Sequence, residues 1–178
     1  MRIIRLQDTF VRPADVTQYT AGDEVSSHAT AASVVLPVFN MAGFSRGHLH
    51  RAAISITPAS GNLVITAADF ALLVFKTDDV IAAVGDNVAL SVSAVNRMLA
   101  VGKFVFANGA WTNPLGALTA STSGFQEVAP VLVTAQGNSF EFTRGETESL
   151  TAVLQATAAW NPGNVANSFK IELGIDVE

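Results

Sequence analysis

Strict alternation of apolar and polar residues is the feature that most restricts what this chain can fold into. In the closing run SFKIELGIDV (168–177), every second residue from Phe169 to Val177 is large and apolar, and the residues between them are polar or small. Because successive side chains of a β-strand point to opposite faces, this pattern is typical of a strand with one buried and one exposed face. The sequence therefore predicts a long strand here.

Similar runs recur along the chain. The run DFALLVFKT (69–77) is almost continuously apolar, which is typical of a strand buried on both faces. GKFVFAN (102–108) places Phe104 and Phe106 on one face. The other strand-like runs are RIIRLQDTFV, SVVLPVFN, HLHRAAISIT, EVAPVLVTA, SFEFT and SLTAVLQATAAW. Turn-forming strings such as TAGD, ASGN and NPGN separate them, so we expect antiparallel strands joined by turns.

These runs predict an all-β fold, an antiparallel β-sandwich with a jelly-roll-like topology and about eight or nine strands. Only DNVALSVSAVNRMLAVG (86–102) shows helical spacing, and we expect one short helix over residues 93–99. Pro37 and Pro130 sit inside strand-like runs, where proline is tolerated at a sheet edge or a bulge. The 178 residues fit one domain, and no linker divides them.

Charged residues are scarce in this chain. They make up 14% of it, against roughly a quarter in an average domain, while hydrophobic residues make up 49%. This balance predicts that a partner covers part of the surface. The net charge of −5 argues against nucleic-acid binding, which needs a basic surface. The sequence contains neither the long apolar run of a membrane span nor a signal peptide, so we expect no membrane contact.

The charge is also distributed unevenly. Residues 1–12 carry three arginines and one aspartate, whereas residues 141–178 carry six acidic and two basic residues. This asymmetry is either ordinary fluctuation or a basic edge that meets an acidic partner, such as another copy of the chain.

No motif in the sequence supports catalysis or metal binding. GFSRG (43–47) matches the G-x-S-x-G pattern of hydrolases, but a strand-like run follows it instead of the helix that the motif requires. His48 and His50 lie two residues apart and share a strand face, yet no third ligand is placed near them. The acids of the 78–86 region match no calcium loop. We expect a protein that is not an enzyme and holds no metal or cofactor.

Two tryptophans allow two interpretations. Trp111 and Trp160 lie beside the turn strings TNP and NPG, and an aromatic ring beside such a turn at a sandwich rim can stack on a sugar. The same rings can instead pack in the core or at a contact between copies. Exposure in a groove would favour a carbohydrate-binding module of a phage fibre or a secreted protein, whereas burial would favour a structural role.

The stretch DTFVRPADVTQYTAGDEV (8–25) resembles the opening of a family of tailed-bacteriophage structural proteins, the capsid decoration or cement proteins that stabilise the head. The matching positions are Arg12, Pro13, Ala14, Asp15, Tyr19, Gly22 and Asp23. FALLVFKTD resembles the central strand of that family, and LQATAAWNPGNVANSFKIELGIDVE resembles its closing hairpin. The family has no catalytic residues to carry over.

The resemblance implies a virion protein, made in the host cytoplasm, that docks on the outer capsid surface. Its partners would be the major capsid protein and further copies of itself, as a trimer or a dimer. The residues expected at the partner contact are Arg2, Arg5, Arg12, Pro13 and Tyr19.

The opening segment has two alternative roles. We expect residues 1–27 to form an amino-terminal arm or edge strand, packed on or extending from a single β-sandwich domain of residues 28–178. Pro13 favours an extended backbone, which suits an arm that attaches to the capsid. In the competing interpretation the segment is an integral edge strand, with Ile3, Ile4, Leu6 and Phe10 in the core.

Overall fold

The structure is a computed structural model. It describes residues 2–14, 16–41, 43–44, 46–58, 69–76, 83–90, 100–107, 124–128, 141–143, 149–162 and 166–177.

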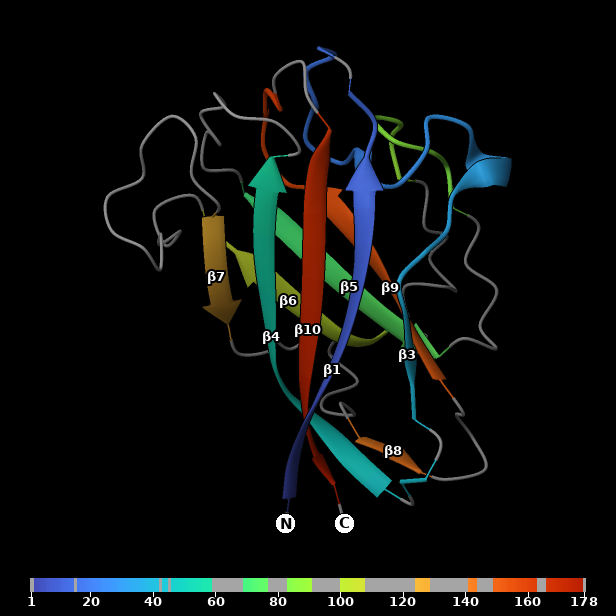
Figure 1. Ribbon diagram of the computed structural model, residues 1–178, viewed down its shortest axis with the longest axis vertical. Helices are drawn as coiled ribbons and strands as arrows, with labels where there is room; N and C mark the ends of the chain where they lie inside the picture. The colour runs from blue at the N-terminus through green and yellow to red at the C-terminus, as the bar shows by residue number, and fades with distance from the viewer. Residues whose placement is uncertain are drawn as a thin grey trace.

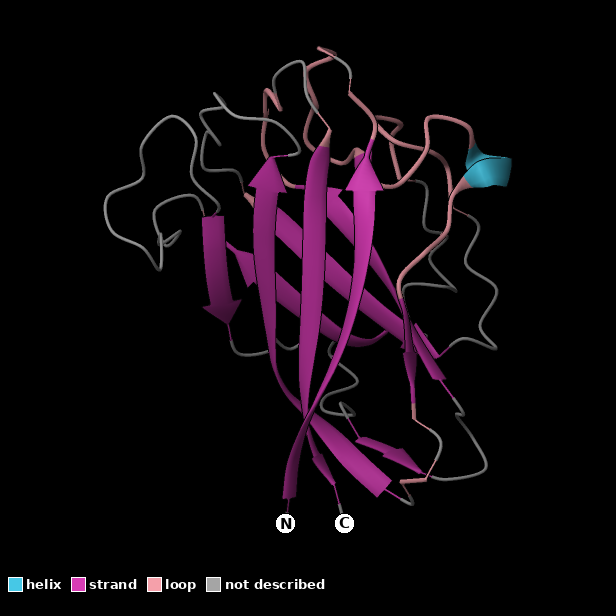
Figure 2. Ribbon diagram, in the orientation of Figure 1, coloured by secondary structure: helices cyan, strands magenta, loops and turns pink. Residues whose placement is uncertain are grey.

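Two five-stranded sheets face each other, and the described residues contain one helical turn outside them (Figures 1 and 2). The first sheet has the order β1-β10-β4-β7, with β8 also paired to β4. Its strands are β1 (Arg2–Arg12), β10 (Asn167–Val177), β4 (Arg46–Pro58), β7 (Gly124–Val128) and β8 (Glu141–Thr143). The second sheet has the order β2-β9-β5-β6, with β3 also paired to β9. Its strands are β2 (Glu24–Val25), β9 (Ser149–Ala156), β5 (Phe70–Lys76), β6 (Ala100–Phe106) and β3 (Val38–Asn40), and the 3-10 helix is η1 (Ala31–Ser33).

The strand pairs are nested along the chain. β1 pairs with β10, β2 and β3 pair with β9, β4 pairs with β7 and β8, and β5 pairs with β6, all antiparallel. A long antiparallel ribbon wound around itself produces this order, which is the topology of a jelly roll. The predicted fold class is therefore confirmed. Both termini lie together at the lower end of the view in Figure 1.

The closing strand behaves as its alternation predicts. In β10 the large apolar side chains from Phe169 to Val177 are buried, whereas Lys170 is exposed and Glu172 half-buried. The strand lies between β1 and β4, so its buried row faces the second sheet and forms a central part of the core.

Residues 2–12 are an edge strand of the domain. β1 pairs with β10 along its whole length, from Arg2 opposite Val177 to Arg12 opposite Asn167. Phe10 is buried and stacks on Phe169 at a ring distance of 5.0 Å, and two further residues, Ile4 and Leu6, pack against the core. Of the four residues named for an integral strand, Ile3 alone points outward and is 54% exposed.

Strand β5 is buried on both faces, as its continuous apolar run predicts. Phe70, Leu72 and Val74 belong to the main core between the sheets. Phe75, on the opposite face, packs in a second cluster with Leu90 and Val153.

The predictions for the two prolines and for the short helix are confirmed in part or lie outside the described residues. Pro37 precedes β3 instead of lying within a strand, and β3 is at the edge of its sheet. Pro130 and the helix expected over 93–99 lie outside the described residues. In the part of the chain that the structure describes, no helix is long and apolar enough to cross a membrane.

Candidate interaction surface

Two of the predicted contact residues lie in the interior. Arg12 and Tyr19 both have 0% exposure. The Arg12 Nε donates to the Tyr19 hydroxyl at 2.6 Å and lies 3.4 Å from Asp86 Oδ2. The period of β1 explains this burial, because its even-numbered residues face the second sheet, and Asp86 supplies the opposite charge. The prediction that Arg12 and Tyr19 touch a partner is therefore corrected: in this fold neither side chain presents any surface.

The buried network continues from these residues into two loop segments. Tyr19 donates its hydroxyl hydrogen to Asp86 Oδ1 at 2.5 Å, and the Ser26 backbone NH donates to the same oxygen at 2.9 Å. Burial, and then the negative charge of Asp86, raise the pKa of the Tyr19 hydroxyl far above its ordinary range, so it remains a donor.

A second carboxylate lies at the edge of this network. Glu24 has 0% exposure, and its Oε2 accepts a hydrogen bond from the Val84 NH at 2.7 Å. Burial raises the pKa of Glu24. Backbone hydrogen bonds also join the two segments, from Glu24 NH to Val88 O and from Asn87 NH to Glu24 O. Together these contacts hold residues 22–26 against residues 84–90.

Trp160 offers no face to a sugar. It is 3% exposed, and its ring lies 5.0 Å from that of Tyr19 and 5.1 Å, edge to face, from that of Phe70. This burial counts against the carbohydrate-binding alternative as far as Trp160 is concerned. Trp111 lies outside the described residues and stays a prediction.

The remaining predicted contact residues are on β1 or directly after it. The Arg5 side chain is 62% exposed and lies 3.5 Å from Glu172 of β10. Pro13 is half-buried, and Arg2 begins β1 opposite Val177. Of the five predicted contact residues, Arg5 is thus the one whose side chain is described as well exposed.

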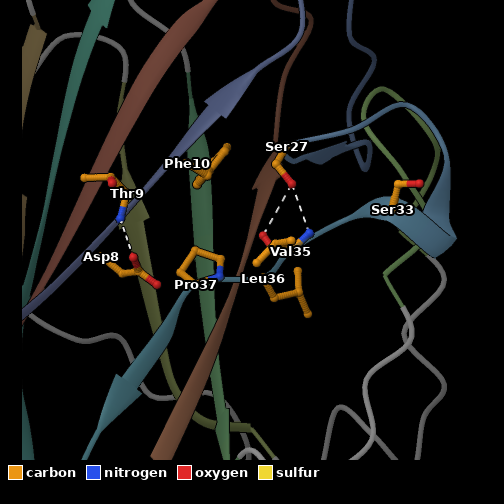
Figure 3. Close-up of a pocket in the computed structure, with 8 residues that line it drawn as sticks. All are labelled: Asp8, Thr9, Phe10, Ser27, Ser33, Val35, Leu36 and Pro37. Carbon is orange, nitrogen blue, oxygen red and sulfur yellow. Dashed lines mark hydrogen bonds between the residues drawn. The ribbon is translucent and has the colours of Figure 1, made fainter.

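A cleft opens between β1 and the segment that leads into β3 (Figure 3). Its volume is about 350 Å³, and its lining consists of Asp8, Thr9, Phe10, Ser27, Ser33, Val35, Leu36 and Pro37. The Asp8 carboxylate joins its two sides, because Oδ1 accepts from the Thr9 NH at 2.7 Å and Oδ2 from the Val38 NH at 2.8 Å. Two other lining residues are also joined, because the Val35 NH donates to Ser27 Oγ at 3.0 Å.

Large apolar side chains are exposed beside this cleft. Val35 is 73% exposed and Val38 is 46% exposed, whereas Val11, which is 52% exposed, lies on the opposite, outer face of β1 from the cleft residue Phe10. Sequence reasoning missed this surface, because a valine that follows a strand pattern gives no sign of whether its outer face is covered.

A third feature is the outer face of β1, β10 and β4, which is turned toward the viewer in Figure 1. His48 and His50 are both exposed on it, so their predicted placement on one face is confirmed. His50 Nδ1 lies 3.6 Å from Asp176 Oδ2. The described residues contain no cluster of three or more His, Cys, Asp or Glu side chains that is suited to a metal ion.

No protein-family model matches the chain, and no curated protein matches it. Similar solved structures include the decameric BFDV capsid protein, which is 10% identical with a TM-score of 0.37 and covers 99% of this chain and 98% of that one. An Israeli acute paralysis virus particle is 12% identical with a TM-score of 0.34 and covers 99% and 73%. The cyanophage Pam1 capsid is 9% identical with a TM-score of 0.34 and covers 99% and 86%. At TM-scores below 0.5, these matches carry no argument about what the chain does.

Proposed function

We propose that this chain is a structural protein of a bacteriophage virion, which binds the outer surface of the capsid and stabilises the major capsid shell. The jelly roll is compatible with that role, and the opening stretch of the sequence resembles capsid decoration proteins. Fold alone does not define function, so the proposal depends on the surface of the molecule.

The exposed apolar side chains at the open edge carry the proposal. The large hydrophobic side chains that are exposed in the described residues are Ile3, Val11, Val16, Val35, Val38, Val88 and Val105. Two of them lie on the edge strand β1, and two more flank the cleft beside it. Such a grouping around a sheet edge favours contact with another protein, which removes the side chains from water.

The edge strand also suggests how the contact forms. In the described residues β1 pairs with β10 on one side only, so an extended partner segment can lie along its other side and place side chains in the cleft. A protein that binds the assembled shell, but not its separated subunits, stabilises the shell by mass action. This is how binding alone, without catalysis, would cement a capsid.

The experiment is co-sedimentation with empty shells that are assembled from the major capsid protein of the phage that encodes this chain. We expect saturable binding, and we expect the double variant Val35→Ser with Val38→Ser to bind about thirtyfold more weakly, because roughly 1 kcal/mol for each of the two valine faces removed from water sums to about 2 kcal/mol. Val105→Ser is the matched control and should bind normally, because Val105 lies on β6, which is separated from β3 by β9 and β5 in the same sheet. Absence of binding by the unmodified protein would refute the proposed function.

A further inference from the structure

We propose that the outer face of β1, β10 and β4 is a docking surface for the carboxylate-rich exterior of the capsid shell. This proposal rests on the proposed function, and it specifies the chemistry of the partner and the face that meets it. It involves a different side of the molecule from Val35 and Val38, whereas Val11 lies on the outer face of β1.

A β-bulge shapes this face. The register of β4 against β10 places Arg51 opposite Gly174 but Leu49 opposite Ile175, so His50 is an additional residue in β4. Such a bulge turns two consecutive side chains to the same face. His50 is accordingly exposed, and its neighbour Arg51 also lies on the outer face.

Gly174 provides the space into which Arg51 folds. A Cβ atom at position 174 would lie 2.6 Å from Arg51 Cγ and 2.9 Å from Arg51 Nε. The arginine stem therefore lies across the neighbouring strand in a position that a side chain at 174 would block. Arg5 is opposite Gly174 on the other side, in β1. Adjacent strands are about 4.8 Å apart, so the two arginines flank Gly174 with about 10 Å between their Cα atoms.

The charge that this face presents is positive. Its described charged side chains, leaving aside the two histidines, are Arg5, Arg51, Lys170, Glu172 and Asp176. The Arg5 side chain is 62% exposed, whereas the side chains of Glu172 and Asp176 are only 20% and 18% exposed. Arg5 and Lys170 are thus more exposed than the two carboxylates, whereas Arg51 is half-buried, on a chain whose net charge is −5.

The spacing of these groups fits an extended acidic surface better than a single small anion. Lys170 is four residues from Gly174 on β10, and Arg5 and Arg51 flank Gly174, so the cationic residues extend over about 14 Å along the strand. The positive groups are spread over three neighbouring strands and do not converge on one point. A surface with several carboxylates can meet such an array, and complementary charge then speeds and orients the encounter.

The test uses neutral variants of the cationic residues. We expect Lys170→Gln and Arg51→Gln each to weaken binding to empty shells of the major capsid protein by about fivefold at low salt. This is the effect of losing one charge pair, which contributes about 1 kcal/mol at 4 Å in water. The salt dependence of binding should fall as well. The matched control is Lys103→Gln, which removes the same charge from β6 of the other sheet. Equal binding by all three variants would overturn the proposal and leave the proposed function intact.

A variant that keeps every charge tests the geometry. Gly174→Ala should displace Arg51 and weaken shell binding, while circular dichroism shows an unchanged fold. If Gly174→Ala unfolds the protein, Lys170→Gln decides alone, because Lys170 is exposed and its removal leaves the core untouched.

A second probe does not depend on the shell. The protein alone should be retarded on a surface coated with poly-L-glutamate at low salt. Lys170→Gln should be retarded less than Lys103→Gln, although the two variants have the same net charge. Equal retention of these variants contradicts the proposal even if no shell binds. If light scattering instead shows self-association that Lys170→Gln abolishes, this face joins copies of the chain and the proposal is wrong.

Discussion

Arg12, Tyr19 and Asp86 form a buried charged network in a protein that has few charges. The Arg12 guanidinium and the Asp86 carboxylate both have 0% exposed side chains, and the Tyr19 hydroxyl bridges them. A buried pair of charges adds little net stability, but removal of one partner leaves the other charge buried and uncompensated. These residues are therefore expected to affect folding when changed, and to affect binding only through folding.

Asp86→Asn is the first prediction at this scale. We expect it to lower the free energy of unfolding by about 3–5 kcal/mol, because Arg12 keeps its charge in the interior. Urea denaturation followed by circular dichroism measures the loss. Asp176→Asn is the control, since that carboxylate is partly exposed and pairs with His50 at the surface, where an ion pair contributes roughly 1 kcal/mol or less. Equal losses in the two variants would argue against the buried network.

The buried carboxyl group of Glu24 makes the stability of the fold depend on pH. Burial raises its pKa in the folded state above the ordinary value of 4.5, so Glu24 binds its proton more tightly in the folded protein than in the unfolded chain. The stability that Glu24 contributes is complete below about pH 4.5, and it is lost as the pH rises through the folded-state pKa. Glu24→Gln should therefore gain stability over the unmodified protein as the pH is raised from 4 to 8. A stability difference that stays constant over this range would refute the assignment.

At the scale of elements, β1 is the strand for which the structure differs most from the attachment arm that the sequence suggested. It pairs with β10 over eleven residues and contributes Phe10 to the core, so deletion of residues 1–27 is expected to unfold the domain. Phe10→Ala should cost about 3–5 kcal/mol in the free energy of unfolding. Val11→Ala, one residue further on the exposed face, should cost much less. Circular dichroism of the truncated chain decides: a folded product would restore the interpretation of an attachment arm.

The sequence predicted those elements whose pattern is local. Alternation over 168–177 identified β10, and the apolar run of β5 identified burial on both faces, because each follows from the side-chain period of one strand. The bulge in β4 also has a signal in the sequence. The apolar positions change from odd to even between Leu49 and Ala52, which marks an additional residue.

The burial of Arg12 could not be predicted in the same way. Charged residues are almost never fully buried without a partner, and its partner Asp86 is distant in the sequence. The exposure of Val35 and Val38 likewise depends on the way two sheets meet at an edge, which no single strand pattern records.

At the scale of the whole molecule, the low charge content and the exposed valines predict self-association. We expect light scattering at micromolar concentration to give the mass of a dimer or a trimer of the 18.6 kDa chain. The double variant Val35→Ser with Val38→Ser should shift the mass toward that of one chain if the open edge joins the copies. A mass of 18.6 kDa for the unmodified protein would contradict self-association.

The most direct test of the proposed cementing role is the thermal stability of the shell itself. Empty shells of the major capsid protein are heated in a calorimeter with and without a saturating amount of this protein. Because a ligand of the assembled shell stabilises it by mass action, we predict that the dissociation temperature rises by several degrees and depends on the protein concentration. The same dissociation temperature with and without the protein would contradict a cementing role.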